Sequence, residues 1–152
     1  MPVTRMLRLS LVVAFAMACS SDAVSAPFRG FVYSAAAFEC GPADGPAVAI
    51  YLAPNPVGSI GPSAPFVRVY VAVQVDQLTA HVWPVAGTNA EAGAWFHPDA
   101  STYEMAESGY MIVSSVDLQN TITGSVDLRF HDAGHIKTAF SAKWQPSNVL
   151  CV

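Results

Sequence analysis

Residues 66–76 alternate strictly between valine and other residue types. Successive side chains of a β-strand point to opposite faces, so every valine of this segment falls on one face. The valine face consists of Val67, Val69, Val71, Val73 and Val75. The opposite face consists of Arg68, Tyr70, Ala72, Gln74 and Asp76. A period of two with one apolar face indicates a half-buried strand and not an amphipathic helix, whose apolar residues recur every three or four positions.

The same alternation recurs along the chain and predicts further strands. It is clear in residues 47–52, 125–131 and 138–144, and weaker in residues 30–35, 81–85 and 109–116. Asp132, Ala133 and Gly134 separate two of these strands, and a short connection with glycine between alternating runs indicates a hairpin. Residues 117–120 look like the turn before it. Residues 109–144 are therefore expected to form a three-stranded antiparallel meander.

Two segments break the alternation. Residues 53–65 contain four prolines and two glycines, which excludes a central strand and predicts a long loop. Residues 86–107 are irregular, and Ser101 followed by Glu104 is the pattern of a capping box that opens one helical turn ending at Gly109. About seven short antiparallel strands predict an all-β domain, either an antiparallel β-sandwich or a small up-and-down β-barrel. The sandwich is favoured because the proline-rich loop offers a crossover between two sheets.

The first two dozen residues have the pattern of an export signal. Arg5 and Arg8 precede an apolar run over residues 9–18. This run of about ten residues is too short to span a membrane, which takes about 20, and has the length of a signal-peptide core. The expected domain organisation is a signal peptide at 1–18, a tether at 19–28 and a single β-domain at 29–152.

The site of cleavage has two interpretations. The sequence Ala16-Met17-Ala18-Cys19 resembles a bacterial lipobox, in which small residues precede a cysteine that becomes lipidated. The resemblance implies a mature protein that begins at Cys19 and is held at a membrane by lipid. The alternative is cleavage after Ala26, which would give a periplasmic or secreted soluble protein. Pro27 disfavours the second site, because its ring fixes the backbone directly after the cut.

The number of cysteines agrees with the lipobox interpretation. The chain has three, and an odd cysteine in an exported protein needs a separate role. Lipidation of Cys19 leaves Cys40 and Cys151 to form a disulfide, since exported proteins lie where disulfides persist. A loop of about 110 residues closed in this way contributes about 4–5 kcal/mol in the chain-entropy model. The alternative is that both cysteines are buried free thiols.

The charge of the mature chain limits its partners. Removal of Arg5 and Arg8 leaves five basic residues against eleven acidic ones, a net charge of −6. An acidic domain with so few basic residues is a poor candidate for binding nucleic acid. It also has no polybasic patch to hold anionic lipid.

The C-terminal third has a distinctive pattern, which runs from Thr121 to Phe130 as TITGSVDLRF, continues through Gly134 to the segment FSAKW at 140–144, and ends in Cys151. This pattern resembles the ends of many uncharacterised exported lipoproteins of bacteria. In those proteins a strand of the form GSxDLxF is followed by a turn, the form FxA and a cysteine near the C-terminus. The resemblance implies a β-domain of the cell envelope. It implies no activity.

The sequence contains no recognisable catalytic motif. A Gly-x-Ser-x-Gly nucleophile elbow is missing, and neither an enzyme nor a cofactor is predicted. A weak metal site is suggested by His131 and His135, which flank the last hairpin turn with Asp132 between them, because imidazole and carboxylate are ligands of zinc and copper.

Aromatic residues provide the remaining candidate. Trp83, Trp95, Phe96 and Tyr103 cluster around the second irregular segment. Aromatics on the loops of a rigid β-scaffold commonly form a recognition surface, although they also serve to close the end of a core. The sequence therefore suggests a non-enzymatic binding or structural module of the envelope, with an unknown protein or envelope component as partner. The alternative is a small barrel that binds an apolar ligand, as lipocalin-like folds do.

Overall fold

The computed structural model describes residues 30–41, 45–58, 61–85 and 91–145. The predicted signal peptide, Cys19, the tether and Cys151 lie outside the described residues. Within the described ranges the chain forms nine strands and one 3₁₀ turn, η1 (Val75–Gln77). The strands are β1 (Tyr33–Cys40), β2 (Pro46–Ala53), β3 (Phe66–Val71), β4 (His81–Pro84), β5 (Ala92–His97), β6 (Glu104–Met105), β7 (Ser108–Val116), β8 (Thr121–Arg129) and β9 (His135–Trp144).

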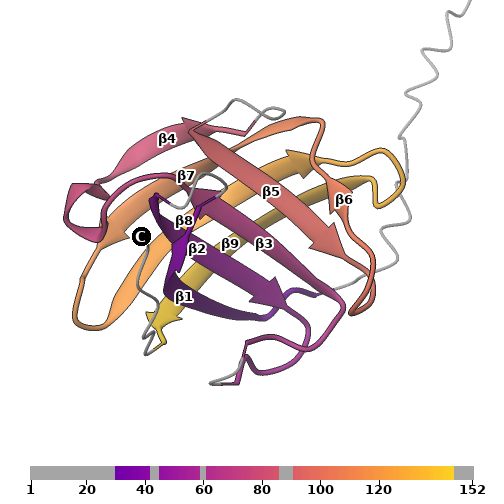
Figure 1. Cartoon of the computed structure of the whole chain (residues 1–152), viewed down its shortest axis with the longest axis horizontal. Helices are drawn as coiled ribbons and strands as arrows, with labels where there is room; N and C mark the ends of the chain where they lie inside the picture. The colour runs from indigo at the N-terminus through magenta and orange to yellow at the C-terminus, as the bar shows by residue number, and fades with distance from the viewer. Residues whose placement is uncertain (1–29, 42–44, 59–60, 86–90, 146–152) are drawn as a thin grey trace, which may run out of the picture.

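The strands form one strongly curled sheet in the order β4-β7-β8-β9-β1-β2-β3-β5-β6 (Figure 1). All neighbours are antiparallel except β1 and β9, which are parallel. The all-β prediction is confirmed, and the curl gives the domain the shape of a half-barrel. The predicted meander of residues 109–144 is also confirmed, as β7, β8 and β9.

The two ends of the strand order are brought together by the chain that runs from β6 into β7. The amide of Ala106 donates to the carbonyl of Ala94 on β5, at 2.9 Å. One residue later, the amide of Glu107 donates to the carbonyl of Arg129 on β8, at 2.8 Å. Ala106 and Glu107 therefore bond to β5 and β8, which lie toward opposite ends of the strand order. These two hydrogen bonds bring the two strands close together.

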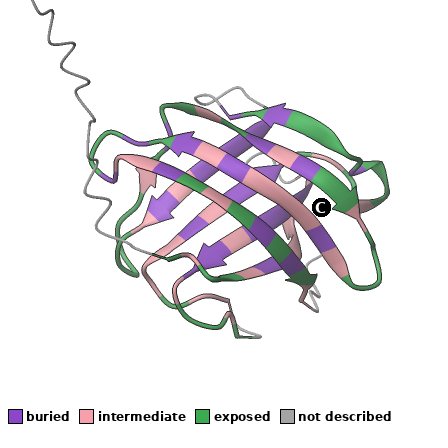
Figure 2. Ribbon diagram, turned by 180° about the vertical axis from the view of Figure 1, so that it is seen from behind, coloured by how far each residue is buried: buried purple, intermediate pink, exposed green. Residues whose placement is uncertain are grey.

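The core fills the inner side of the curl. Val67, Val69 and Val71 on β3 are fully buried, as the alternation predicts. Figure 2 shows buried residues interspersed with more exposed ones along the strands. The strand ends at Val71, earlier than expected, because the amide of Val73 bonds to the carbonyl of Val71 in a tight turn. Val73 and Val75 lie beyond this turn and are only partly buried against the core.

Three local predictions are wrong. The segment predicted to be irregular contains β5 and β6. The expected capping box does not form, because Asp99, and not Ser101, caps this turn: its carboxylate accepts the backbone amides of Ser101 and Thr102, each at 2.8 Å. The proline-rich loop joins β2 to its direct neighbour β3 and does not cross between two sheets. In the described part of the chain there is no helix long and apolar enough to cross a membrane.

Candidate binding face and surface clefts

An ion pair lies on the outer side of the sheet, across β1, β2 and β3. The Nε of Arg68 donates to Oε2 of Glu39 at 2.9 Å, and the hydroxyl of Tyr51 donates to the other oxygen of the same carboxylate. The side chains of Arg68 and Glu39 are only 24% and 20% exposed. The pair is therefore largely covered although it sits outside the core, which implies that neighbouring side chains shield it.

Aromatic rings provide this shield. Tyr70 and Trp95 stack with ring centroids 4.7 Å apart, and the guanidinium carbon of Arg68 lies 5.1 Å from the centroid of Trp95. Both are favourable geometries, the second because the face of an aromatic ring attracts a cation. Phe66 stacks on His97 at 4.4 Å. We call this group the outer aromatic face, and it consists of Glu39, Tyr51, Phe66, Arg68, Tyr70, Trp95 and His97.

Small residues allow the large side chains to lie flat. A Cβ atom on Gly93 would come within 2.3 Å of Cε1 of Tyr70, so the ring occupies the space that a side chain would take. Ala47 and Ala49 lie on the same outer side of β2 and are nevertheless completely buried. The absence of a side chain at Gly93 thus leaves room for the ring of Tyr70 to stack on Trp95.

His97 has an altered acidity within this face. Its burial, followed by the positive charge of Arg68, lowers the pKa of the imidazole below its ordinary value of 6.5, against a smaller opposing effect of a backbone hydrogen bond with Thr102. The neutral ring is consequently favoured near neutral pH, and its stacking on Phe66 brings no second cation beside Arg68.

A cleft of about 360 Å³ opens between β1 and β9. Phe31, Leu52 and Phe140 provide apolar surface, and Ser34, Ser141 and Lys143 provide polar groups. This combination of an apolar wall with a few polar groups is common in sites for small ligands, and the volume falls in their usual range of roughly 300–1,000 Å³. We call it the β1–β9 cleft.

A second cleft of about 430 Å³ lies beside the turn between β8 and β9. Glu104 contributes to its wall and accepts the backbone amides of Asp132 and Ala133 at 2.7 and 3.0 Å. The nearby turn is held by Asp99, whose pKa is lowered by hydrogen bonds, first from the Thr102 hydroxyl and then from the Ser101 amide. Both carboxylates are therefore occupied by the backbone and hold turns in place.

The four aromatic residues singled out from the sequence do not form one surface. Trp83 and Phe96 are buried in the core cluster. Trp95 points outward and belongs to the outer aromatic face, whereas Tyr103 is 64% exposed and lines the second cleft. Neither of the two clefts is lined by Trp83 or Trp95.

The two histidines of the suggested metal site pair with different carboxylates. Nδ1 of His131 lies 3.4 Å from Glu107, whereas Nε2 of His135 lies 2.7 Å from Asp127. The hydrogen bond from His135, followed by that from Lys137, lowers the pKa of Asp127. Among the described residues, no three histidine, cysteine, aspartate or glutamate side chains are grouped so that they could hold a metal ion.

Most of the outer aromatic face was not anticipated from the sequence. Arg68 and Tyr70 occupy the non-valine positions of the most regular strand, where short polar residues are the usual occupants of a surface facing water. The large size of Arg68 and Tyr70 was the sequence feature that could have indicated a packed outer face. Glu39 and Tyr51 carried no such signal, because their contacts with Arg68 depend on the pairing of β1, β2 and β3.

The comparisons with known proteins found no match. No protein-family model matches the chain, and neither a curated protein nor a solved structure is significantly similar to it.

Proposed function

We propose that this protein is a non-enzymatic binding domain of the bacterial cell envelope, tethered by lipid on Cys19, and that it binds a protein partner through the outer aromatic face. The observation that carries the proposal is the packing of Arg68 between Glu39 and Trp95 on the outer side of the sheet. Tryptophan, tyrosine and arginine are the residues most enriched at the energetic centres of protein interfaces.

The rigidity of this face supports a binding role. Its side chains project from paired strands. Strand β3 pairs with β5 along its whole length and with β2 along residues 67–71. Side chains that are already fixed by stacking and by an ion pair lose little conformational freedom on association. Trp95 and Phe66 are half-buried, so each retains apolar surface that a partner would cover.

The amino acids at the N-terminus support the export and the anchor. The basic flank, the short apolar run and the small residues before Cys19 together favour lipidation. The ten residues at 20–29 would allow a reach of at most roughly 36 Å between a lipid on Cys19 and the described domain. This distance is sufficient to present the outer aromatic face to another protein at the same membrane.

The geometry at the end of β9 supports a disulfide between Cys40 and Cys151. The amide of Gln145 donates to the carbonyl of Ala36 at 2.7 Å, and β1 and β9 are parallel there. Cys40 lies four residues beyond Ala36, roughly 13 Å along the strand. Cys151 lies six residues beyond Gln145, a reach of at most roughly 21 Å. The length of chain after Gln145 is therefore sufficient for Cys151 to meet Cys40.

Site-specific photo-crosslinking in intact cells tests the binding face. A photoreactive residue at Met105, which is 38% exposed and opposite Trp95, should yield one defined protein adduct. The same residue at Leu118, which is 50% exposed in the turn between β7 and β8, is the matched control and should yield none. Trp95→Ala should abolish the adduct at Met105. Equal crosslinking at both positions, or none at Met105, would contradict the proposed interface.

The intact mass of the protein purified from a bacterial envelope tests the anchor and the disulfide together. The expected mass corresponds to a chain that begins at Cys19, carries acyl groups and lacks the two hydrogen atoms that disulfide formation removes. An unlipidated chain that begins elsewhere would overturn the anchor and leave the crosslinking result unaffected.

A further inference from the structure

The sheet has a wedge-shaped opening between β1 and β9. The two strands pair at only two positions, Ala35 with Lys143 and Ala36 with Trp144. On its other side β9 pairs with β8 over nine consecutive positions, and β1 pairs with β2 over eight. The backbone edge of β9 before Ala142 therefore faces the β1–β9 cleft without a partner strand among the described residues. Such an edge offers unpaired amide groups to a ligand.

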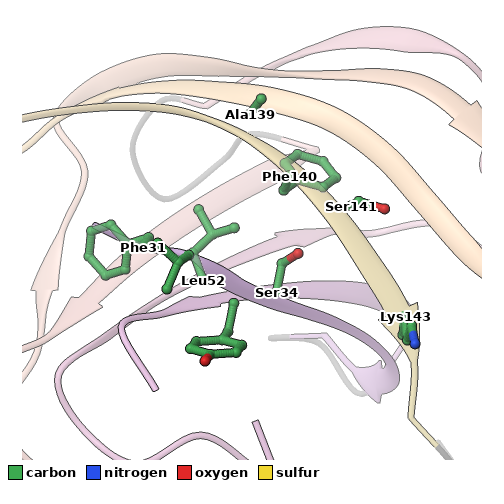
Figure 3. A pocket seen from close by; sticks show the side chains of 9 residues that line it. Phe31, Ser34, Leu52, Ala139, Phe140, Ser141 and Lys143 are labelled. Atoms are coloured by element: carbon green, nitrogen blue, oxygen red, sulfur yellow. The ribbon is translucent and has the colours of Figure 1, made fainter. Parts of the chain in front are cut away.

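The base of the opening is apolar. Leu52 and Phe140 are 1% and 7% exposed and belong to the core, and Phe31 packs against the same core. Figure 3 shows Phe31 and Leu52 beside each other, with Phe140 across the opening on β9. The cleft thus reaches from the surface to the edge of the core, and a bound molecule would cover apolar side chains there.

The rim of the opening carries polar groups that are available to a ligand. Within the described part of the chain, the side chains of Ser34, Ser141 and Lys143 make no hydrogen bond or ion pair, although all three line the cleft. The described residues that line it include no acidic side chain. The local charge is consequently positive in a protein that is otherwise acidic, which favours an anionic ligand.

We propose that the β1–β9 cleft binds a small amphipathic carboxylate, a molecule with a short apolar chain and one carboxylate group. The chain would cover Phe31, Leu52 and Phe140. The carboxylate would accept hydrogen bonds from Lys143 and from the hydroxyl groups at the rim, and a charge-assisted bond of this kind is stronger than a neutral one. The residues that line this cleft do not belong to the outer aromatic face, and the proposal does not depend on the proposed protein partner.

Titration of the mature protein with decanoate, below the concentration at which decanoate forms micelles, tests the proposal by heteronuclear NMR. The expected result is saturable shifts at Leu52, Phe140 and Ser141, with no comparable shifts at Trp95 and His97 on β5. Decanol, which has the same chain and no charge, should bind more weakly. Shifts spread over the whole surface, or equal affinity for decanol, would overturn the proposal.

Three variants make the test specific. Lys143→Gln should weaken decanoate binding by roughly two- to fivefold, as expected for an exposed charge. Lys137→Gln, on the same strand and outside the cleft, should leave the affinity unchanged. Ala139→Phe fills the opening from its exposed side and should abolish binding while the remaining NMR spectrum shows an intact fold. Unchanged affinity in Ala139→Phe would place the ligand elsewhere and overturn the site.

Discussion

Arg68 on β3 reaches diagonally over β2 to Glu39 on β1, with the guanidinium Nε 2.9 Å from Oε2 of the carboxylate. The contact connects three neighbouring strands on the outer side of the sheet, and Tyr51 on the middle strand bonds to the same carboxylate. One polar contact therefore links side chains of β1, β2 and β3. Trp95, which lies beside the guanidinium of Arg68, adds a side chain from β5 to the outer aromatic face.

Removal of the arginine should destabilise the fold. Arg68→Met leaves the largely covered carboxylate of Glu39 without its cation, and we expect a loss of about 1–3 kcal/mol in the free energy of unfolding, since the Tyr51 hydroxyl remains. Urea denaturation measures this loss. Arg129→Met, at an exposed position of β8, is the matched control and should change stability by less than about 0.5 kcal/mol. Equal effects of the two variants would show that the ion pair contributes nothing.

A methyl group at Gly93 should displace the ring of Tyr70. Gly93→Ala places a Cβ atom in space that the ring already fills, so the stacking on Trp95 must shift. We expect a destabilisation of about 1–3 kcal/mol and a change in the near-UV circular dichroism of the stacked pair. Gly45→Ala is the control, because its Cβ would meet nothing within 4 Å.

The double variant Gly93→Ala/Tyr70→Ala separates steric overlap from other effects of the glycine. If the ring is what the added methyl group meets, the cost of the glycine substitution should largely disappear once Tyr70 is truncated. Strict additivity of the two substitutions would show that the contact with Tyr70 is not the cause.

The fold should lose stability as pH falls below about 6.5. The pKa of His97 is lower in the folded protein than in the unfolded chain, so the unfolded state binds more protons in this range. Stability contributed by the neutral ring is full above the unfolded value of 6.5 and declines as pH falls toward the folded pKa. Urea midpoints at about pH 7.5 and 5.5 should differ less in His97→Asn than in the wild type. His131→Asn, which removes an exposed imidazole, controls for the loss of a histidine.

Glu104 should hold the turn between β8 and β9. Glu104→Ala removes the acceptor of two backbone amides, and we expect a loss of about 1 kcal/mol because water partly replaces the carboxylate at this exposed turn. Amide hydrogen exchange should become faster at Asp132 and Ala133 in particular. Glu107→Ala, whose carboxylate faces exposed His131, is the control and should leave exchange at these two amides unchanged.

Reduction of the protein should lower its stability if Cys40 and Cys151 are paired. The chain-entropy model gives about 4–5 kcal/mol for a loop of this length. The urea midpoint should fall on addition of a reductant, and a Cys40→Ser/Cys151→Ser variant should show the lower midpoint with and without reductant. A wild-type midpoint that does not respond to reductant would indicate two free thiols.

The all-β architecture and most of the strands were determined by the sequence itself. Three local features indicated them: the alternation around Val69, the prolines of residues 53–65 and the turn at Gly134. Each acts over a few residues, so it can be recognised without knowledge of distant contacts. The apolar run before Cys19 is likewise recognised as a signal-peptide core by its length and its flanking residues. The predictions of export and lipidation rest on the sequence alone.

Only the tertiary structure decided where the candidate sites lie. Strand β5 begins Ala-Gly-Ala and lacks a clear local signal, and it becomes a strand because it pairs with β3 along six positions. That pairing brings Trp95 onto Arg68, and the pairing of β1 with β2 brings Glu39 to the same place. The β1–β9 cleft arises before the point where two strands that are distant in the sequence come together at two paired positions. Contacts of this kind depend on which strands become neighbours and in which register, and a pattern of period two specifies only which face of a strand is buried.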